Sequence, residues 1–187
     1  MIIEHKNFID ADMLMNLWHH VTLPHWRFGQ KSNDDTLYPM WVQNFYDTHN
    51  NRYKENACQH IVKAGDMFLD LCPEDYVMVR SMICGNTFGQ DGDIHDDWLV
   101  SGESLTGVLY LNRRWEDNWG GETIVYSDNK TEISKFEAGK LIMFDGSNPH
   151  IGKGPQRNCG ELRCILAIQA VKMDAWQKHI DKMRNKS

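Results

Sequence analysis

The chain contains 187 residues, of which 25% are charged, and its formal net charge is −6. This length supports one domain with a sizeable core, so we expect residues 1–187 to form a single domain. The negative charge argues against a dedicated nucleic-acid binder, because neutralising phosphates requires clustered lysine and arginine side chains.

The N-terminal residues MIIEHKNFID lack the apolar run of a secretion signal, and no later stretch has the length and apolarity of a membrane span. The five cysteines are odd in number, and no two of them form a Cys-x-x-Cys pair. We therefore expect reduced thiols in a cytoplasmic protein that has no membrane contact. The oligomeric state stays open.

Two amphipathic segments open the chain. Over residues 10–21, apolar residues recur at helical spacing after Asp10, a typical N-cap residue. A longer helix is predicted over residues 52–72, ended by Pro73. We interpret residues 1–75 as a helical support region.

After residue 75 the pattern changes to short β-branched or aromatic runs separated by turn residues. Dense short strands without helices between them favour an antiparallel sandwich or barrel. We expect a mainly β protein with flanking helices, with a double-sheet core over residues 76–172 and a final helix over residues 173–187. The runs are YVMVRSMIC, SLTGVLYLN, ETIVYSD, TEISKF, KLIMFD, HIGKG and LRCILAIQAV.

His95, Asp97 and the distant His150 form a candidate metal-binding set. If the first two lie on a strand, alternation points them to one face and turns Asp96 to the other. Two imidazoles and one carboxylate that leave the remaining positions open suit non-haem Fe(II). The alternatives are a chance pair of surface residues, or a zinc hydrolase, which usually shows a third histidine close in sequence.

Arg163 begins a run of mostly apolar residues, so alternation can turn it toward the barrel interior. A buried guanidinium needs an anion, and its planar fork suits a carboxylate. The alternative is a strand-end arginine paired with Glu161. Tyr110 is a phenol on a predicted core strand, where an ordinary core role is equally compatible with the sequence.

Four stretches together resemble one family: NTFGQDGDIHDD, TGVLYLNRRWEDNWGGET, KLIMFDGSNPH and ELRCILAI. They are similar to the prolyl 4-hydroxylase-like branch of the Fe(II)/2-oxoglutarate-dependent dioxygenase superfamily, including small bacterial and phage members and the hypoxia-type prolyl hydroxylases. The similarity covers residues 77–171. It implies a double-stranded β-helix, or jelly roll, with iron at the open mouth between its sheets.

By the same resemblance, His95, Asp97 and His150 would be the iron ligands. The implied cofactor is Fe(II), with 2-oxoglutarate and O2 as co-substrates and ascorbate as an optional reductant. No catalytic residue beyond the metal centre is implied.

The resemblance also implies a binding site for 2-oxoglutarate. Arg163 would bind its C5 carboxylate with the help of Tyr110, and Asn86 would lie near its C1 carboxylate. Relatives place a tyrosine near Asn86. The spacing from His150 to Arg163 is longer than in the hypoxia-type enzymes, which leaves Arg157 as the alternative.

The resulting functional hypothesis is hydroxylation of a C–H bond, most of all in a prolyl residue of a peptide or protein, with release of succinate and CO2. One alternative keeps the chemistry on a free amino acid or another small molecule. The other is a non-catalytic jelly-roll binding module with a structural metal. We expect substrate choice to lie in residues 87–94, residues 113–119 and the N-terminal region through Trp41. Trp115 and Trp119 are interpreted as a rigid loop packed on the barrel.

Overall fold

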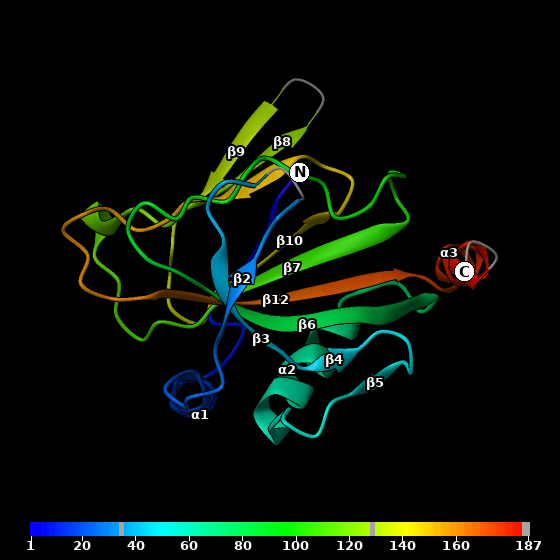
Figure 1. Cartoon of the computed structure of the whole chain (residues 1–187), viewed down its shortest axis with the longest axis horizontal. Helices are drawn as coiled ribbons and strands as arrows, with labels where there is room; N and C mark the ends of the chain where they lie inside the picture. The colour runs from blue at the N-terminus through cyan, green and yellow to red at the C-terminus, as the bar shows by residue number, and fades with distance from the viewer. Residues whose placement is uncertain (34–35, 128–129, 185–187) are drawn as a thin grey trace.

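The computed structural model describes residues 1–33, 36–127 and 130–184. Seven antiparallel strands form the main sheet, in the order β1-β10-β7-β12-β6-β3-β2 (Figure 1). They are β1 (Ile3–His5), β2 (Arg27–Gln30), β3 (Met40–Asn44), β6 (Tyr76–Asn86), β7 (Ser104–Tyr110), β10 (Leu141–Asp145) and β12 (Arg163–Lys172).

A smaller antiparallel sheet packs on the main sheet, with its three strands in the order β11-β8-β9. Side chains from both sheets share one buried cluster, in which Val125 of the small sheet meets Val108 and Ile165 of the main sheet. The predicted mainly β architecture with two packed sheets is therefore confirmed. The strands of the small sheet are β8 (Thr123–Ser127), β9 (Lys130–Ser134) and β11 (His150–Gly152).

Strand β12 lies in the middle of the main sheet and is buried on both faces. Ile165 packs between the two sheets, whereas Cys164, Leu166 and Ile168 pack on the opposite face. A strand that is covered on both sides is expected to be apolar throughout. This explains the run LRCILAIQAV and makes a charged residue at its first position exceptional.

Helices α1 (Ala11–Val21) and α2 (Gln59–Leu69) cover the outer face of the main sheet (Figure 1). Leu17 of α1 and Phe68 of α2 are fully buried in the same cluster as Leu166. Helix α1 starts after Asp10, whose carboxylate accepts a hydrogen bond from the Met13 N–H at 2.7 Å. The N-cap prediction is therefore confirmed.

The prediction of a helix over residues 52–72 was wrong at its start. Residues Arg52–Tyr53 form strand β5, which pairs with β4 (Tyr46–Asp47), and the helix begins only at Gln59. The rings of Tyr46 and Tyr53 meet edge to face with centroids 5.2 Å apart. This cross-strand aromatic contact stabilises the hairpin against continuation of the helical pattern.

The prediction that residues 1–75 form a helical support region also needs correction. Strand β1 pairs with β10, and β3 pairs with β6, so the N-terminal strands extend the main sheet on both sides. They cover strand edges that would otherwise expose unpaired backbone groups. The predicted boundary at residue 76 therefore lies within one continuous sheet.

The last described element is helix α3 (Met173–Arg184), which follows β12 without a break and lies beyond the ends of β12 and β6 (Figure 1). The final helix was predicted over residues 173–187, of which residues 185–187 lie outside the described residues. A short 3-10 helix, η1, spans Asp117–Trp119. Among the helices in the described ranges, none has the length and apolar character to cross a membrane.

Candidate active site

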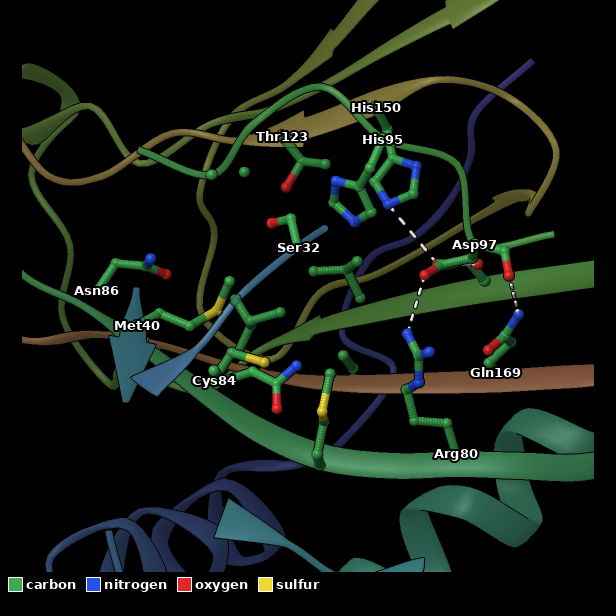
Figure 2. A pocket seen from close by; sticks show the side chains of 18 of the residues that line it. Ser32, Met40, Arg80, Cys84, Asn86, His95, Asp97, Thr123, His150 and Gln169 are labelled. Atoms are coloured by element: carbon green, nitrogen blue, oxygen red, sulfur yellow. Dashed lines mark hydrogen bonds and ion pairs between the residues drawn. The ribbon is translucent and has the colours of Figure 1, made fainter. Parts of the chain in front are cut away.

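A cavity of about 160 Å³ lies between the two sheets. Alternate residues of β6 form one wall, from Arg80 through Met82 and Cys84 to Asn86 (Figure 2). The register of β6 with β12 pairs Asn86 with Arg163 and Arg80 with Gln169. The cavity therefore has an Arg163 end and an Arg80 end, separated along β12 by about 20 Å of strand.

His95, Asp97 and His150 converge at this cavity, with one potential ligand atom of each lying within 4.8 Å of the others. His95 and His150 form an antiparallel bridge, in which each backbone N–H donates to the other's carbonyl, at 3.1 and 2.8 Å. The Asp97 N–H donates to Gly146 O at 2.8 Å. Main-chain hydrogen bonds thus fix the backbone positions of all three residues. Their side chains point toward one another in Figure 2.

Both imidazoles are oriented through their Nδ1 atoms. His95 Nδ1 lies 2.8 Å from Asp93 O, and His150 Nδ1 lies 3.0 Å from Asn148 O. A carbonyl can only accept, so each Nδ1 carries the proton and each Nε2 keeps a free lone pair for a metal. Burial lowers the pKa of His150, which favours the neutral form that metal binding requires.

Three strands hold the Asp97 side chain and backbone. Arg80 Nη1 donates to Oδ1 at 2.9 Å, Thr106 Oγ1 donates to Oδ2 at 2.7 Å, and Gln169 Nε2 donates to the backbone carbonyl at 3.1 Å. Burial by itself raises the pKa of Asp97, but Arg80, followed by His150 and Thr106, outweighs it and holds the pKa below its usual value. The carboxylate is thus kept anionic, as a metal ligand must be.

At the other end of the cavity, Arg163 is only 2% exposed. Its Nε donates to Gly121 O at 2.7 Å, and its Nη2 donates to Thr123 Oγ1 at 3.2 Å. Within the described ranges no carboxylate lies within ion-pair distance of it. A Cβ added to Gly152 would lie 3.6 Å from Nη1, so the bare glycine leaves space beside the guanidinium. A buried cation with neutral partners and adjoining space fits an anionic ligand.

The other predicted residues have different positions. Asn86 lines the cavity and donates through Nδ2 to Gln90 O at 3.0 Å. Tyr110 is fully buried behind Arg163 and is not among the residues that line the cavity; its hydroxyl donates to Thr123 Oγ1 at 3.0 Å. Arg157 is exposed. The structure thus places Arg163, and not the alternative arginine, at the cavity.

Of the loops predicted to choose the substrate, the N-terminal region contributes Gln30, Lys31, Ser32 and Met40 to the cavity. The hydroxyl of Ser32 is buried and has no hydrogen-bond partner in the described part of the chain. The loop over residues 113–119 does not line the cavity. Its Trp115 stacks on Phe136, with ring centroids 4.2 Å apart, as expected of a rigid packed loop.

Sequence reasoning missed Arg80, Thr106, Thr123 and Gln169. Arg80 carried a usable signal, because it is a charged residue in an apolar strand and shares its face with Asn86 by alternation. Thr106 and Thr123 carried none, since threonine is common in strands.

Two packed antiparallel sheets with a His-Asp-His cluster and a buried arginine between them define the site of a jelly-roll metalloprotein. The family model of the 2OG-Fe(II) oxygenase superfamily matches residues 79–168, which contain all four of these side chains. The 2OG-Fe(II) oxygenase superfamily is thus the family that residues 79–168 resemble, in agreement with the prediction from the sequence. Enzymes of this superfamily use Fe(II), 2-oxoglutarate and O2.

A PKHD-type hydroxylase of Prochlorococcus marinus is 35% identical over 75 residues, which is 40% of this chain and 33% of that protein. The chain thus spans about a third of the length of this relative. An oxidoreductase of the 2OG-Fe(II) oxygenase family from Burkholderia pseudomallei superposes with a TM-score of 0.70 and 15% identity, over 91% of this chain and 85% of that chain.

Two prolyl hydroxylases share the same fold. For a Pseudomonas putida prolyl-4-hydroxylase the TM-score is 0.65 and the identity 18%, over 91% of this chain and 92% of that chain. For a Trichoplax adhaerens prolyl hydroxylase, in complex with a peptide fragment of hypoxia inducible factor, the values are 0.66 and 17%, over 92% and 84%. These similarities confirm the predicted double-stranded β-helix.

Proposed function

We propose that the protein hydroxylates a C–H bond of a prolyl residue in a peptide or protein, consuming O2 and 2-oxoglutarate and releasing succinate and CO2. The observation that carries the proposal is the pairing of the His95, Asp97 and His150 cluster with an uncompensated buried Arg163 in one cavity. A metal site alone fits many chemistries. A metal site facing a buried cation fits a chelating dicarboxylate.

In this proposal, His95 and His150 bind Fe(II) through Nε2, and Asp97 binds it through its carboxylate. Bound Fe(II) with 2-oxoglutarate supplies the O2 activation by which one oxygen atom enters the substrate and the other enters succinate. Arg163 binds the C5 carboxylate with its free guanidinium edge, and the apolar side chains of Met82 and Val108 limit water in the cavity.

Two further side chains complete the proposed co-substrate pocket. The unpartnered Ser32 hydroxyl and the Asn86 amide both line the cavity and can donate to carboxylate oxygens. Tyr110 acts indirectly in this arrangement, because its hydroxyl bonds to Thr123, which in turn accepts from Arg163.

The test is 2-oxoglutarate turnover by the purified protein with Fe(II) and ascorbate, combined with mass spectrometry of proline-containing peptides and of free amino acids. We expect Fe(II)-dependent succinate formation and a peptide product heavier by one oxygen atom on proline. Absence of Fe(II)-dependent succinate with every substrate would contradict the proposal.

A second candidate keeps the chemistry and acts on a free amino acid or other small molecule. The small volume of the cavity, about 160 Å³, favours it. Oxidation of a free amino acid with no product on any peptide would establish this candidate. The match to the superfamily model favours either enzyme over the non-catalytic binding module.

A further inference from the structure

A second hollow, of about 480 Å³, lies next to the cavity. Arg80, Asp97 and Gln169 line both spaces, so they form a shared wall. The opposite side of the hollow consists of Trp98 and of Trp176 and His179 from α3. We call this hollow the Trp98 groove. Its lining runs from Asp97 and Arg80 to Trp176 and His179 of α3. Helix α3 lies beyond the ends of β6 and β12 (Figure 1).

The aromatic side of the Trp98 groove is preorganised by contacts within the protein. The rings of Trp176 and His179 are stacked at 17°, with centroids 5.3 Å apart, and the Trp98 ring lies 5.1 Å from that of His179. Trp98 Nε1 donates to Glu103 Oε2 at 3.1 Å. Trp98 and Trp176 also pack on a small buried cluster that includes Val171. The rings therefore need little ordering on binding.

The charge of the Trp98 groove is acidic. Asp96 and Glu103 line it, and neither forms an ion pair in the described part of the chain. The one arginine of the groove, Arg80, is neutralised by Asp97. Carboxylates beside electron-rich ring faces attract an ammonium or guanidinium group, by Coulomb attraction and by cation–π contact.

An apolar rim adjoins these acidic and aromatic groups. Leu99 is 88% exposed and Val100 is 50% exposed, and both line the groove. Two neighbouring exposed aliphatic side chains at the entrance of a concave site are typical of a surface that a polypeptide covers.

We propose that the Trp98 groove binds the segment of a polypeptide substrate next to the target residue and takes one of its lysine or arginine side chains. This inference rests on the proposed function, and it selects a polypeptide over a free amino acid. A ligand that reaches the metal cluster and also fills the groove must pass the wall formed by Arg80, Asp97 and Gln169. A peptide with a basic side chain can extend past these three side chains and occupy both spaces, which a single amino acid does less readily.

The test compares the binding of two labelled peptides to the protein loaded with Mn(II) and 2-oxoglutarate. Each peptide has a central proline, flanked on both sides by lysines in one and by glutamates in the other. We expect the lysine peptide to bind at least about fivefold more tightly. The double variant Asp96→Asn with Glu103→Gln should lose this preference. The control Asp181→Asn removes one charge from α3 at a position that does not line the groove, and this variant should keep the preference for the lysine peptide.

A second variant tests the aromatic side. Trp176→Leu should weaken binding of the lysine peptide, while the wild-type and variant affinities for Mn(II) stay equal. Equal binding of both peptides, no binding of either, or a preference that survives the double variant would overturn the inference. Concentration-dependent dimerisation that Trp176→Leu abolishes would also overturn it, because a second copy of the chain would then occupy the groove.

Failure of the groove and failure of the proposed function are separable. Fe(II)-dependent succinate formation without a lysine preference would reject the groove alone. A lysine preference in a protein that never consumes 2-oxoglutarate would reject the proposed function alone.

Discussion

The two ends of the cavity each contain one arginine, and the two arginines are satisfied in different ways. Arg80 has an anion within the protein, the Asp97 carboxylate, at 2.9 Å. In the described ranges, Arg163 has hydrogen bonds to the Gly121 carbonyl and the Thr123 hydroxyl and lies over the rings of Tyr110 and Phe136, but it has no carboxylate partner. A buried cation is costly without an anion, so the Arg163 end is electrostatically incomplete until an anionic ligand binds. The Arg80 end is complete, and it instead fixes a metal ligand.

This difference predicts which variants disturb the metal and which disturb the co-substrate. The largest effect is expected from His95→Ala, because removing one of three ligands leaves two that cannot hold Fe(II) at a useful affinity. We expect Fe(II)-dependent 2-oxoglutarate turnover to be lost, and Co(II) absorption titrations to show no saturable site. The exposed His49→Ala is the control and should behave as the wild type. Full turnover by His95→Ala would contradict the metal assignment.

Arg163→Met should come next and should act on the co-substrate alone. Loss of charge-assisted hydrogen bonds worth about 1.5–3 kcal/mol should raise the KM for 2-oxoglutarate by about 10- to 150-fold. Co(II) affinity should not change. Arg157→Met is the matched control, since Arg157 is exposed and was the alternative from sequence. An unchanged KM for 2-oxoglutarate in Arg163→Met would show that the Arg163 end of the cavity does not bind the co-substrate.

Arg80→Met should show the opposite pattern to Arg163→Met. Without its ion pair, Asp97 loses the main group that keeps it anionic and oriented. We expect Co(II) affinity to fall by about tenfold or more, with little change in the KM for 2-oxoglutarate. Arg80→Lys keeps the charge and should recover part of the metal affinity. A rise in the KM without loss of metal affinity would show that the two ends are not separate.

The smallest effects are expected from a pair of threonines, one at each end. Thr106→Val removes the hydrogen bond to Asp97 and should weaken metal binding by about three- to tenfold. Thr123→Val removes the acceptor of Arg163 and should raise the KM for 2-oxoglutarate by a similar factor. Each is the control for the other, since the side-chain change is identical. If Thr106→Val and Thr123→Val lowered metal affinity equally, the two ends of the cavity would not have separate roles.

Sequence reasoning succeeded where the chemistry of a residue is conspicuous. The order of His95, Asp97, His150 and Arg163 was enough to predict the cluster and the buried cation. Strand alternation alone does not select Asp97 over Asp96, because His95 lies in an isolated bridge and not on a regular strand. Local patterns could not predict β1 and β2, since both are short and largely exposed; β1 forms only by pairing with the distant β10, and β2 by pairing with the neighbouring β3.

The bridge between His95 and His150 has a consequence for how such a site can be redesigned. The two histidines are joined directly through their own main chains, so the connecting segments contribute only the Asp93 and Asn148 carbonyls that orient the rings. Residues 87–91 can therefore accept exchanges while the cluster persists, whereas Asp93 and Asn148 have to keep their positions. New specificities could be grafted there without rebuilding the metal site.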